Sequence, residues 1–213
     1  WRGVSGNSNQ GGSLLIVGRD GVWEYDTRRG LNALPVAERE RWMLPAAAVA
    51  YADKLYVLDR QAQQIFRYLP ANQVYPNPAE PFFASPQPGL ADALDMAIDG
   101  FIYILFTNSR IAKYAAGSPA AFELNALDKP LSNATAIFAL PDQTVRYLYV
   151  VDAGNRRIVQ LTKDGRFARQ IKPGLDIALD FGGLRTVCVD EAGDKLYAAD
   201  AHSLYIANLP HIP

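Results

Sequence analysis

Short runs of apolar residues recur along the chain at a nearly regular interval. Each run has the pattern of a strand that is buried on both faces, and the copies begin at residues 15, 55, 102, 148 and 196. Successive copies start 40, 47, 46 and 48 residues apart. The last four carry a tyrosine at their second position: Tyr56, Tyr103, Tyr149 and Tyr197. So constant an interval indicates an internal structural repeat.

Each run is followed, after a short polar turn, by a segment in which apolar and polar residues alternate. Alternation with a period of two predicts a half-buried strand. A further apolar run precedes four of these pairs, and a less regular one follows, most clearly at residues 166–171. The pattern therefore predicts four strands in each repeat.

Four short strands in a unit of about 40–50 residues are typical of a β-propeller blade. We therefore predict an all-β fold, a β-propeller with five four-stranded units that belong to a six-bladed ring. A helical solenoid would need apolar residues spaced by three and four over ten or more positions, and no window has that spacing. A β-sandwich would not repeat its strands in groups of four with the same tyrosine in the second strand.

The repeat predicts a single domain with units at approximately 1–40, 41–88, 89–130, 131–178 and 179–213. In the first unit, residues 1–4 would have to supply the inner strand, because residues 5–13 have the composition of a flexible loop. The fifth unit ends without a fourth strand. Either the N-terminal segment closes a five-bladed ring, or the chain is the larger part of a six-bladed ring and continues upstream. We favour the second, because residues 1–4 have the pattern of the end of an inner strand that begins upstream. An open ring would expose apolar faces, so we expect the natural chain to continue upstream.

Several residues recur in step with the repeat. Asp59, Asp152 and Asp200 end equivalent runs, where a carboxylate can accept hydrogen bonds from backbone N–H groups of the following turn. We interpret them as structural residues rather than as a catalytic ring, and the four tyrosines as packing residues. Cys188, in an apolar inner strand, is predicted to be an inert core thiol. Residues 69–89, which hold six of the 14 prolines, are predicted to join two units, with an edge strand near residues 81–84.

Composition narrows the range of functions. Apolar residues make up 49% of the 213 residues, which is enough for a packed core. The net charge of −1 argues against a generally basic nucleic-acid binder. Two histidines and one cysteine provide few zinc ligands, and no apolar run is long enough to cross a membrane as a helix. We predict no cofactor and no metal.

One segment, residues 146–172, is strongly basic. It holds seven lysines and arginines against two aspartates, and such a cluster attracts an acidic protein, anionic lipid headgroups or an RNA backbone. The alternative interpretation is a solvated rim without a partner. An aromatic stacking platform, which RNA readers use, is not evident between the charges. The candidate binding residues are Arg146, Arg156, Arg157, Arg166 and Arg169.

The fourth unit resembles an NHL repeat. It reads LYVVDAGNRRIVQL at residues 148–161, followed by DGRF at 164–167; the second unit replaces the glycine–asparagine turn, and the third and fifth keep only part of it. This resemblance implies a mostly six-bladed propeller. More loosely, the chain is similar to the propeller half of bacterial membrane-anchored proteins whose other half is a signalling domain such as a type-2C phosphatase. That similarity implies an extracytoplasmic location, with membrane attachment outside this chain.

NHL-like propellers serve as protein-interaction platforms, ligand sensors, RNA readers and, in some relatives, lactonases or lyases. We predict a non-enzymatic module that presents loops to a protein or a small ligand. The alternatives are a calcium-dependent, lactonase-like hydrolase or lyase, and an RNA-binding NHL domain. A calcium site needs six to eight oxygen ligands, whereas Asn108, Asn133, Asn155 and Asn208 fall at unmatched positions within their units.

Overall fold

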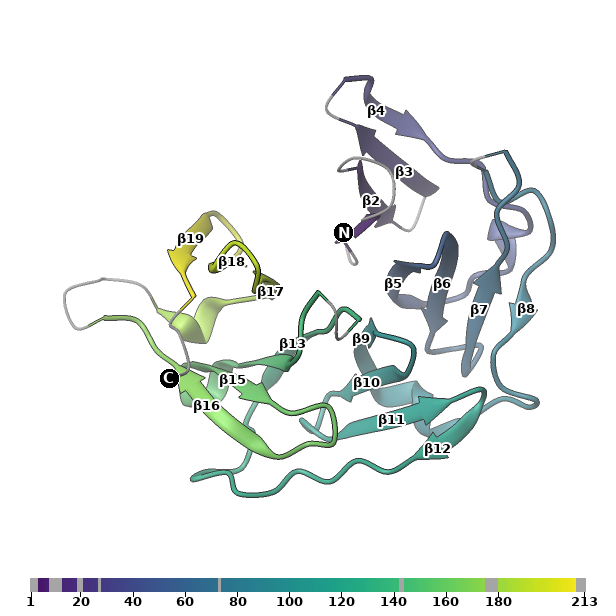
Figure 1. Cartoon of the computed structure of the whole chain (residues 1–213). Coiled ribbons are helices and arrows are strands. Elements are labelled where there is room, and N and C mark those ends of the chain that lie inside the picture. Colours follow the sequence, from purple (N-terminus) through teal and green to yellow (C-terminus); the bar gives the residue numbers. More distant parts are fainter. Residues whose placement is uncertain are drawn as a thin grey trace. The chain divides into compact units, whose positions relative to one another are not determined.

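The computed structural model describes residues 4–7, 13–18, 21–26, 28–72, 74–141, 144–174 and 180–209. These residues form four four-stranded sheets and one three-stranded sheet (Figure 1). In every sheet, neighbouring strands are consecutive in the chain, which is the arrangement of a propeller blade.

Each sheet falls within one of the units expected from the sequence. The first contains β1 (Val4–Asn7), β2 (Ser13–Gly18), β3 (Gly21–Asp26) and β4 (Gly30–Ala33). The second contains β5 (Pro45–Tyr51), β6 (Lys54–Asp59), β7 (Gln64–Tyr68) and β8 (Glu80–Pro81). The third contains β9 (Ala93–Ile98), β10 (Ile102–Phe106), β11 (Ile111–Ala115) and β12 (Ser118–Ala120). The fourth contains β13 (Ala134–Phe138), β14 (Leu148–Asp152), β15 (Arg157–Leu161) and β16 (Phe167–Ile171), and the fifth β17 (Thr186–Asp190), β18 (Lys195–Ala199) and β19 (Leu204–Asn208).

The helical content of the described residues consists of single 3-10 turns: η1 (Arg39–Arg41), η2 (Pro88–Asp92), η3 (Ala153–Asn155) and η4 (Phe181–Gly183). Within this part of the chain, no helix has the length and apolar character to cross a membrane.

The innermost strand of the first sheet corrects one prediction. β1 runs from Val4 to Asn7 and pairs in antiparallel register with β2, with Val4 opposite Ile16 and Asn7 opposite Ser13. Residues 5–7 were expected to be loop because they lack an apolar pattern. Strand pairing is made by backbone N–H and C=O groups, so it does not require that pattern. The edge strand expected near residues 81–84 lies slightly earlier, at Glu80–Pro81.

The chain divides into two compact units, residues 1–95 with 116–118 and residues 96–115 with 119–213. In the first unit, Val22 of β3 packs with Leu55 and Val57 of β6, and with Tyr68 and Tyr75. In the second unit, the fourth and fifth sheets share a core in which Val151 and Ile158 meet residues of β17 and β18.

Burial of the second strand follows the sequence pattern in the third and fourth sheets, where every residue of β10 and β14 is buried. The fifth sheet differs, because in β18 buried and partly exposed residues alternate. The two faces of that sheet are therefore buried to different extents among the described residues. Cys188 of β17 lies on the less buried face and is exposed, so its prediction as a core thiol is wrong.

Candidate functional site

The predicted basic residues are distributed over different parts of the fourth sheet. Pairing of Leu148 with Leu161 and of Asp152 with Arg157 fixes the two ends of that sheet. Arg146 and Arg166 precede strands at one end, whereas Arg156 follows η3 at the other. The five arginines therefore do not form one continuous patch.

Two of these arginines are exposed beside a carboxylate. The side chain of Arg146 is 77% exposed, and its Nε lies 4.0 Å from Oε2 of Glu191. The side chain of Arg156 is 74% exposed, and its Nε lies 3.5 Å from Oδ1 of Asp180. Arg169 is only partly exposed, and its Nε donates to Oε1 of Gln160. Arg166 is exposed.

Arg157 is a structural residue rather than a surface cation. Its side chain is 1% exposed, and its Nε donates to Oδ2 of Asp152 at 2.7 Å. Its Nη1 donates to Asp128 and to Oε1 of Gln170, and its Nη2 to the carbonyl of Lys129 at 2.6 Å. The guanidinium beside Asp128 lowers the pKa of that carboxyl. Removing Arg157 from the predicted patch corrects the sequence interpretation, because Arg157 begins β15, a strand in which every residue is buried.

The recurring aspartates bind backbone groups around the turn that follows each second strand. Asp59 is fully buried and accepts hydrogen bonds from the N–H groups of Met43, Leu44, Gln61 and Ala62 at 2.6–3.2 Å. It thereby joins the turn after β6 to the segment before β5. These contacts leave little capacity for a ligand.

Asp152 and Asp200 occupy equivalent places. Asp152 is fully buried and accepts from Ser132 N–H at 2.7 Å, Asn155 Nδ2 at 2.8 Å and Arg157. Oδ1 of Asp200 accepts from the N–H groups of His202 at 2.7 Å and Ser203 at 2.8 Å. The same carboxyl accepts the Tyr205 hydroxyl at 2.7 Å.

The recurring tyrosines lie in the sheets rather than around a common ligand. Tyr56, Tyr103 and Tyr149 are buried, and Tyr197 is partly exposed. The hydroxyl of Tyr149 donates to Oε1 of Glu191 at 3.0 Å, and burial raises its pKa. The hydroxyl of Tyr103 donates to Oδ2 of Asp99 at 3.1 Å, which also pairs with Nζ of Lys163 at 2.6 Å. These contacts join the fourth sheet to the neighbouring turns within the second unit.

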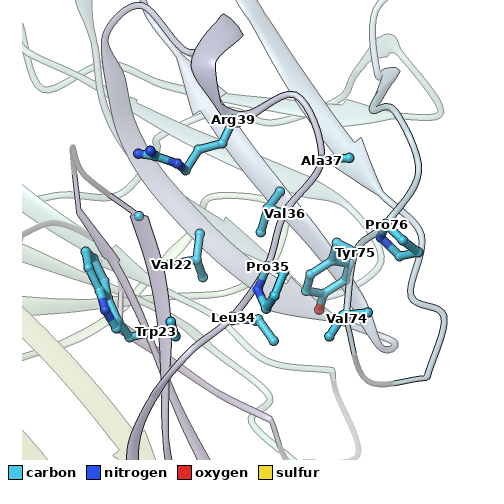
Figure 2. A pocket seen from close by; sticks show the side chains of 12 residues that line it. Val22, Trp23, Leu34, Pro35, Val36, Ala37, Arg39, Val74, Tyr75 and Pro76 are labelled. Atoms are coloured by element: carbon cyan, nitrogen blue, oxygen red, sulfur yellow. The ribbon is translucent and has the colours of Figure 1, made fainter.

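A cavity lies in the first unit, beside β3 (Figure 2). Two extended segments build it: the chain after β4 and the chain around Tyr75. Leu34 N–H donates to the Val22 carbonyl at 2.8 Å, which ties the first segment to β3. Ala37 N–H donates to the Tyr75 carbonyl at 2.8 Å, and Tyr75 N–H to the Pro35 carbonyl at 3.1 Å. Backbone hydrogen bonds therefore link the segment after β4 both to β3 and to the segment around Tyr75.

The pocket has a volume of about 430 Å³ and a mostly apolar lining. Figure 2 shows Val22, Trp23, Val36 and Tyr75 around it, with Arg39 at one side. The remaining lining residues are Gly21, Ala33, Leu34, Pro35, Ala37, Val74 and Pro76.

Neighbouring groups position two of the lining side chains, those of Trp23 and Tyr75. The Trp23 ring lies against Gly21, where an added Cβ would come within 3.2 Å of two ring carbons, so the absence of a side chain at residue 21 lets the indole lie there. Tyr75 is 7% exposed, and its hydroxyl donates to the Asp53 carbonyl at 3.2 Å. Burial raises the pKa of Tyr75 to about 12, so this phenol is neutral at physiological pH.

The sequence analysis did not identify this pocket. Three of its lining residues, Val74, Tyr75 and Pro76, lie within the proline-rich residues 69–89, which were interpreted as a loop that joins two units. Within the described ranges, no three His, Cys, Asp or Glu side chains are grouped so as to hold a metal ion.

The sequence matches no known family model, and no curated protein matches it. The structure is similar to solved propeller proteins. A chain of the nidogen/laminin complex aligns with a TM-score of 0.67 at 18% identity, over 98% of this chain and 75% of that one. A gluconolactonase from Xanthomonas campestris aligns with a TM-score of 0.61 at 14% identity, over 97% and 71% of the two chains. A virginiamycin B lyase from Staphylococcus aureus aligns with a TM-score of 0.53 at 14% identity, over 99% and 70%.

At these identities the similarity establishes the fold alone, and it confirms the predicted all-β propeller class. It does not support the predicted phosphatase-like companion domain. The three proteins are named as two enzymes and one chain of a protein complex, so the fold is compatible with catalysis and with binding. Function has to be inferred from the site.

Proposed function

We propose that the chain is a non-catalytic binding module, and that the pocket of the first unit holds an apolar, ring-sized group of a small ligand. The pocket of about 430 Å³ falls within the range of about 300–1,000 Å³ that is usual for ligand sites. Its apolar lining, with Trp23 and Tyr75 on the walls, favours an aromatic or aliphatic group. This lining is the observation that carries the proposal.

The rigidity of the pocket also favours binding. Its walls are linked by backbone hydrogen bonds from Leu34, Ala37 and Tyr75, so a ligand would not have to order a loop on entry. Binding to a preorganised site avoids that entropic cost. The Tyr75 hydroxyl already donates to the Asp53 carbonyl, which fixes the orientation of this ring on the pocket wall.

The alternative functions have less support from the described residues. A calcium-dependent hydrolase of the lactonase type would need free oxygen ligands, but the buried carboxylates of Asp59 and Asp152 already accept hydrogen bonds from neighbouring groups. An RNA reader would need cations along one surface, whereas Arg156 lies beside Asp180 and Arg157 is buried.

The proposal is tested with anilinonaphthalene sulfonate, a probe whose fluorescence rises in apolar surroundings. Ala37→Leu adds bulk to the pocket lining without removing the Ala37 N–H contact, and should abolish most of the probe binding. Ala62→Leu is the matched control, because Ala62 is also partly exposed but lies outside the pocket. It should bind like the unaltered chain.

A third variant separates the pocket from the other apolar surface of the molecule. Ile206 is 63% exposed on the fifth sheet, and Ile206→Lys should leave pocket binding intact. Probe binding that survives Ala37→Leu but disappears with Ile206→Lys would contradict the proposed site. Equal binding by all variants would do so as well.

A further inference from the structure

The pocket of the first unit contains one charged side chain among the described residues that line it, that of Arg39. Arg39 begins η1 and is partly exposed. Figure 2 shows its guanidinium beside Val22 and Val36 and apart from Tyr75. The pocket therefore combines an apolar lining with a cation on one side.

The acidic residue before Arg39 in the sequence already has a basic partner. Oε2 of Glu38 lies 2.7 Å from Nη1 of Arg41. A guanidinium carries five N–H donors in a planar arrangement, so Arg39 can bind an anion in addition to the interactions that it makes within the chain. Carboxylates and related oxyanions match that arrangement, because two parallel N–H groups can donate to two oxygens.

Other polar groups of the wall form hydrogen bonds within the chain. The N–H groups of Leu34, Ala37 and Tyr75 donate to carbonyls, and the Tyr75 hydroxyl donates to the Asp53 carbonyl. A polar group of a ligand would lose hydration on entry and would need a partner inside the pocket. Arg39 provides such a partner, and it favours a negatively charged group.

Negative charge near Tyr75 indicates how such a ligand would be oriented. Burial and then the negative charges of Asp53 and Glu24 raise the pKa of Tyr75, so both carboxylates act on this side of the pocket. Neither of them belongs to the lining. An anion would be repelled from Tyr75 and attracted to Arg39, which leaves the aromatic wall to an uncharged ring.

We infer, on the basis of the binding function proposed above, that the ligand is an organic acid: an apolar ring that carries one oxyanion group, such as a carboxylate. The ring lies against the apolar lining, and the oxyanion accepts hydrogen bonds from the Arg39 guanidinium. A neutral molecule with the same ring binds more weakly, because it gains no charge-assisted hydrogen bond.

Two fluorescent probes that differ by one charged group provide the test. Anilinonaphthalene sulfonate and N-phenylnaphthylamine share the same rings, and only the first carries an oxyanion. The ratio of their affinities is measured by fluorescence titration in the unaltered chain, in Arg39→Gln and in Arg41→Gln. A substitution that merely disturbs the pocket weakens both probes, so the ratio isolates the effect of the charge.

Arg39→Gln should lower the affinity for the sulfonate probe, relative to the neutral probe, by roughly 10-fold or more, which is the usual contribution of a hydrogen bond to a charged group. Arg41→Gln is the matched control, because it removes the same charge from the same turn at a side chain that is 65% exposed and outside the lining. It should leave the ratio unchanged. A ratio that stays unchanged in Arg39→Gln, or that falls equally in Arg41→Gln, would overturn the inference.

A second pair of compounds extends the test from sulfonate to carboxylate. Naphthalene carboxylate and naphthalene carboxamide have the same ring and nearly the same size, and they differ in charge. The carboxylate should displace the neutral probe at a roughly 10-fold lower concentration than the carboxamide, and this difference should disappear in Arg39→Gln. Equal displacement by the two compounds in the unaltered chain would overturn the preference for an organic acid.

The results separate failure of the ligand assignment from failure of the binding function. Loss of both probes in Ala37→Leu, together with an unchanged ratio in Arg39→Gln, would support the binding function and overturn the organic acid as its ligand. Saturable binding of neither probe, or binding that Ala37→Leu does not weaken, would overturn the binding function and the organic acid with it.

Discussion

Replacing Arg157 by alanine should destabilise the protein strongly, whereas the same change at the adjacent Arg156 should have little effect. Arg157 is 1% exposed and bonds the fully buried Asp152. Its removal leaves Asp152 with the Ser132 N–H and the Asn155 side chain as remaining donors. Loss of one partner from a buried ion pair costs about 3–5 kcal/mol, because the other charge stays buried without compensation.

Arg156 provides the matched control. Its side chain is 74% exposed, and its contact with Asp180 measures 3.5 Å between Nε and Oδ1. Exposed ion pairs contribute about 0–1 kcal/mol. The two substitutions delete the same side chain at neighbouring positions, so the difference between them isolates burial and partner geometry.

Urea unfolding followed by far-ultraviolet circular dichroism measures both effects. All three tryptophans precede residue 43, so tryptophan fluorescence would report mainly on the first unit and is less suitable. With a slope of about 2–3 kcal/mol per molar urea, Arg157→Ala should lower the midpoint by roughly 1–2 M. Arg157→Lys should recover little, since an ammonium group cannot reproduce the planar fork of donors. A midpoint for Arg157→Ala equal to that of Arg156→Ala would refute the reasoning.

Three further predictions concern the aspartates and metal binding. Asp59→Ala should destabilise the protein by about 1–3 kcal/mol in urea unfolding and Asp59→Asn by less, because alanine removes the acceptor of four backbone N–H groups. Hydrogen bonds from the His202 N–H, the Tyr205 hydroxyl and the Ser203 N–H lower the pKa of Asp200; the stability that this carboxylate contributes is therefore complete above about pH 4 and is lost as the pH falls through its lowered pKa. Asp200→Asn should accordingly flatten the fall of the urea midpoint with acid, and an unchanged acid profile would contradict this assignment. In equilibrium dialysis the chain should bind no stoichiometric calcium, and tight binding of one ion would favour the hydrolase alternative.

The propeller fold could be predicted from the sequence because the apolar runs recur with each sheet. Burial of β10 and β14 on both faces requires continuous apolar runs, and these runs were the strongest signal in the chain. The inner strand of the first sheet was expected at residues 1–4 rather than at Val4–Asn7, because Ser5, Gly6 and Asn7 pair through the backbone and leave no hydrophobic pattern. The prediction that the domain is part of a longer propeller stays a prediction.

The candidate binding residues and the pocket were much harder to predict from the sequence. Arg156 and Arg157 are identical in type and adjacent, yet one is at the surface and the other is buried, because a turn ends and β15 begins between them. Arg156 ends the η3 turn, outside the strand, whereas all five residues of β15 are buried. Cys188 was misplaced because exposed and buried residues alternate along β17, although the strand is mostly apolar in sequence. The pocket depends on Trp23 and Tyr75, which are about 50 residues apart in sequence, and no local motif connects them.

The proposed binding function is tested most directly by the indole N–H resonances of the protein during a titration with anilinonaphthalene sulfonate. Trp23 lines the pocket, whereas the Trp42 indole donates to the Tyr68 hydroxyl at 2.6 Å and is not part of the lining. The account predicts a saturable shift of the Trp23 resonance that disappears with Ala37→Leu, while the Trp42 resonance stays in place. A Trp23 resonance that does not move on addition of the probe, or that moves equally in Ala37→Leu, would contradict it.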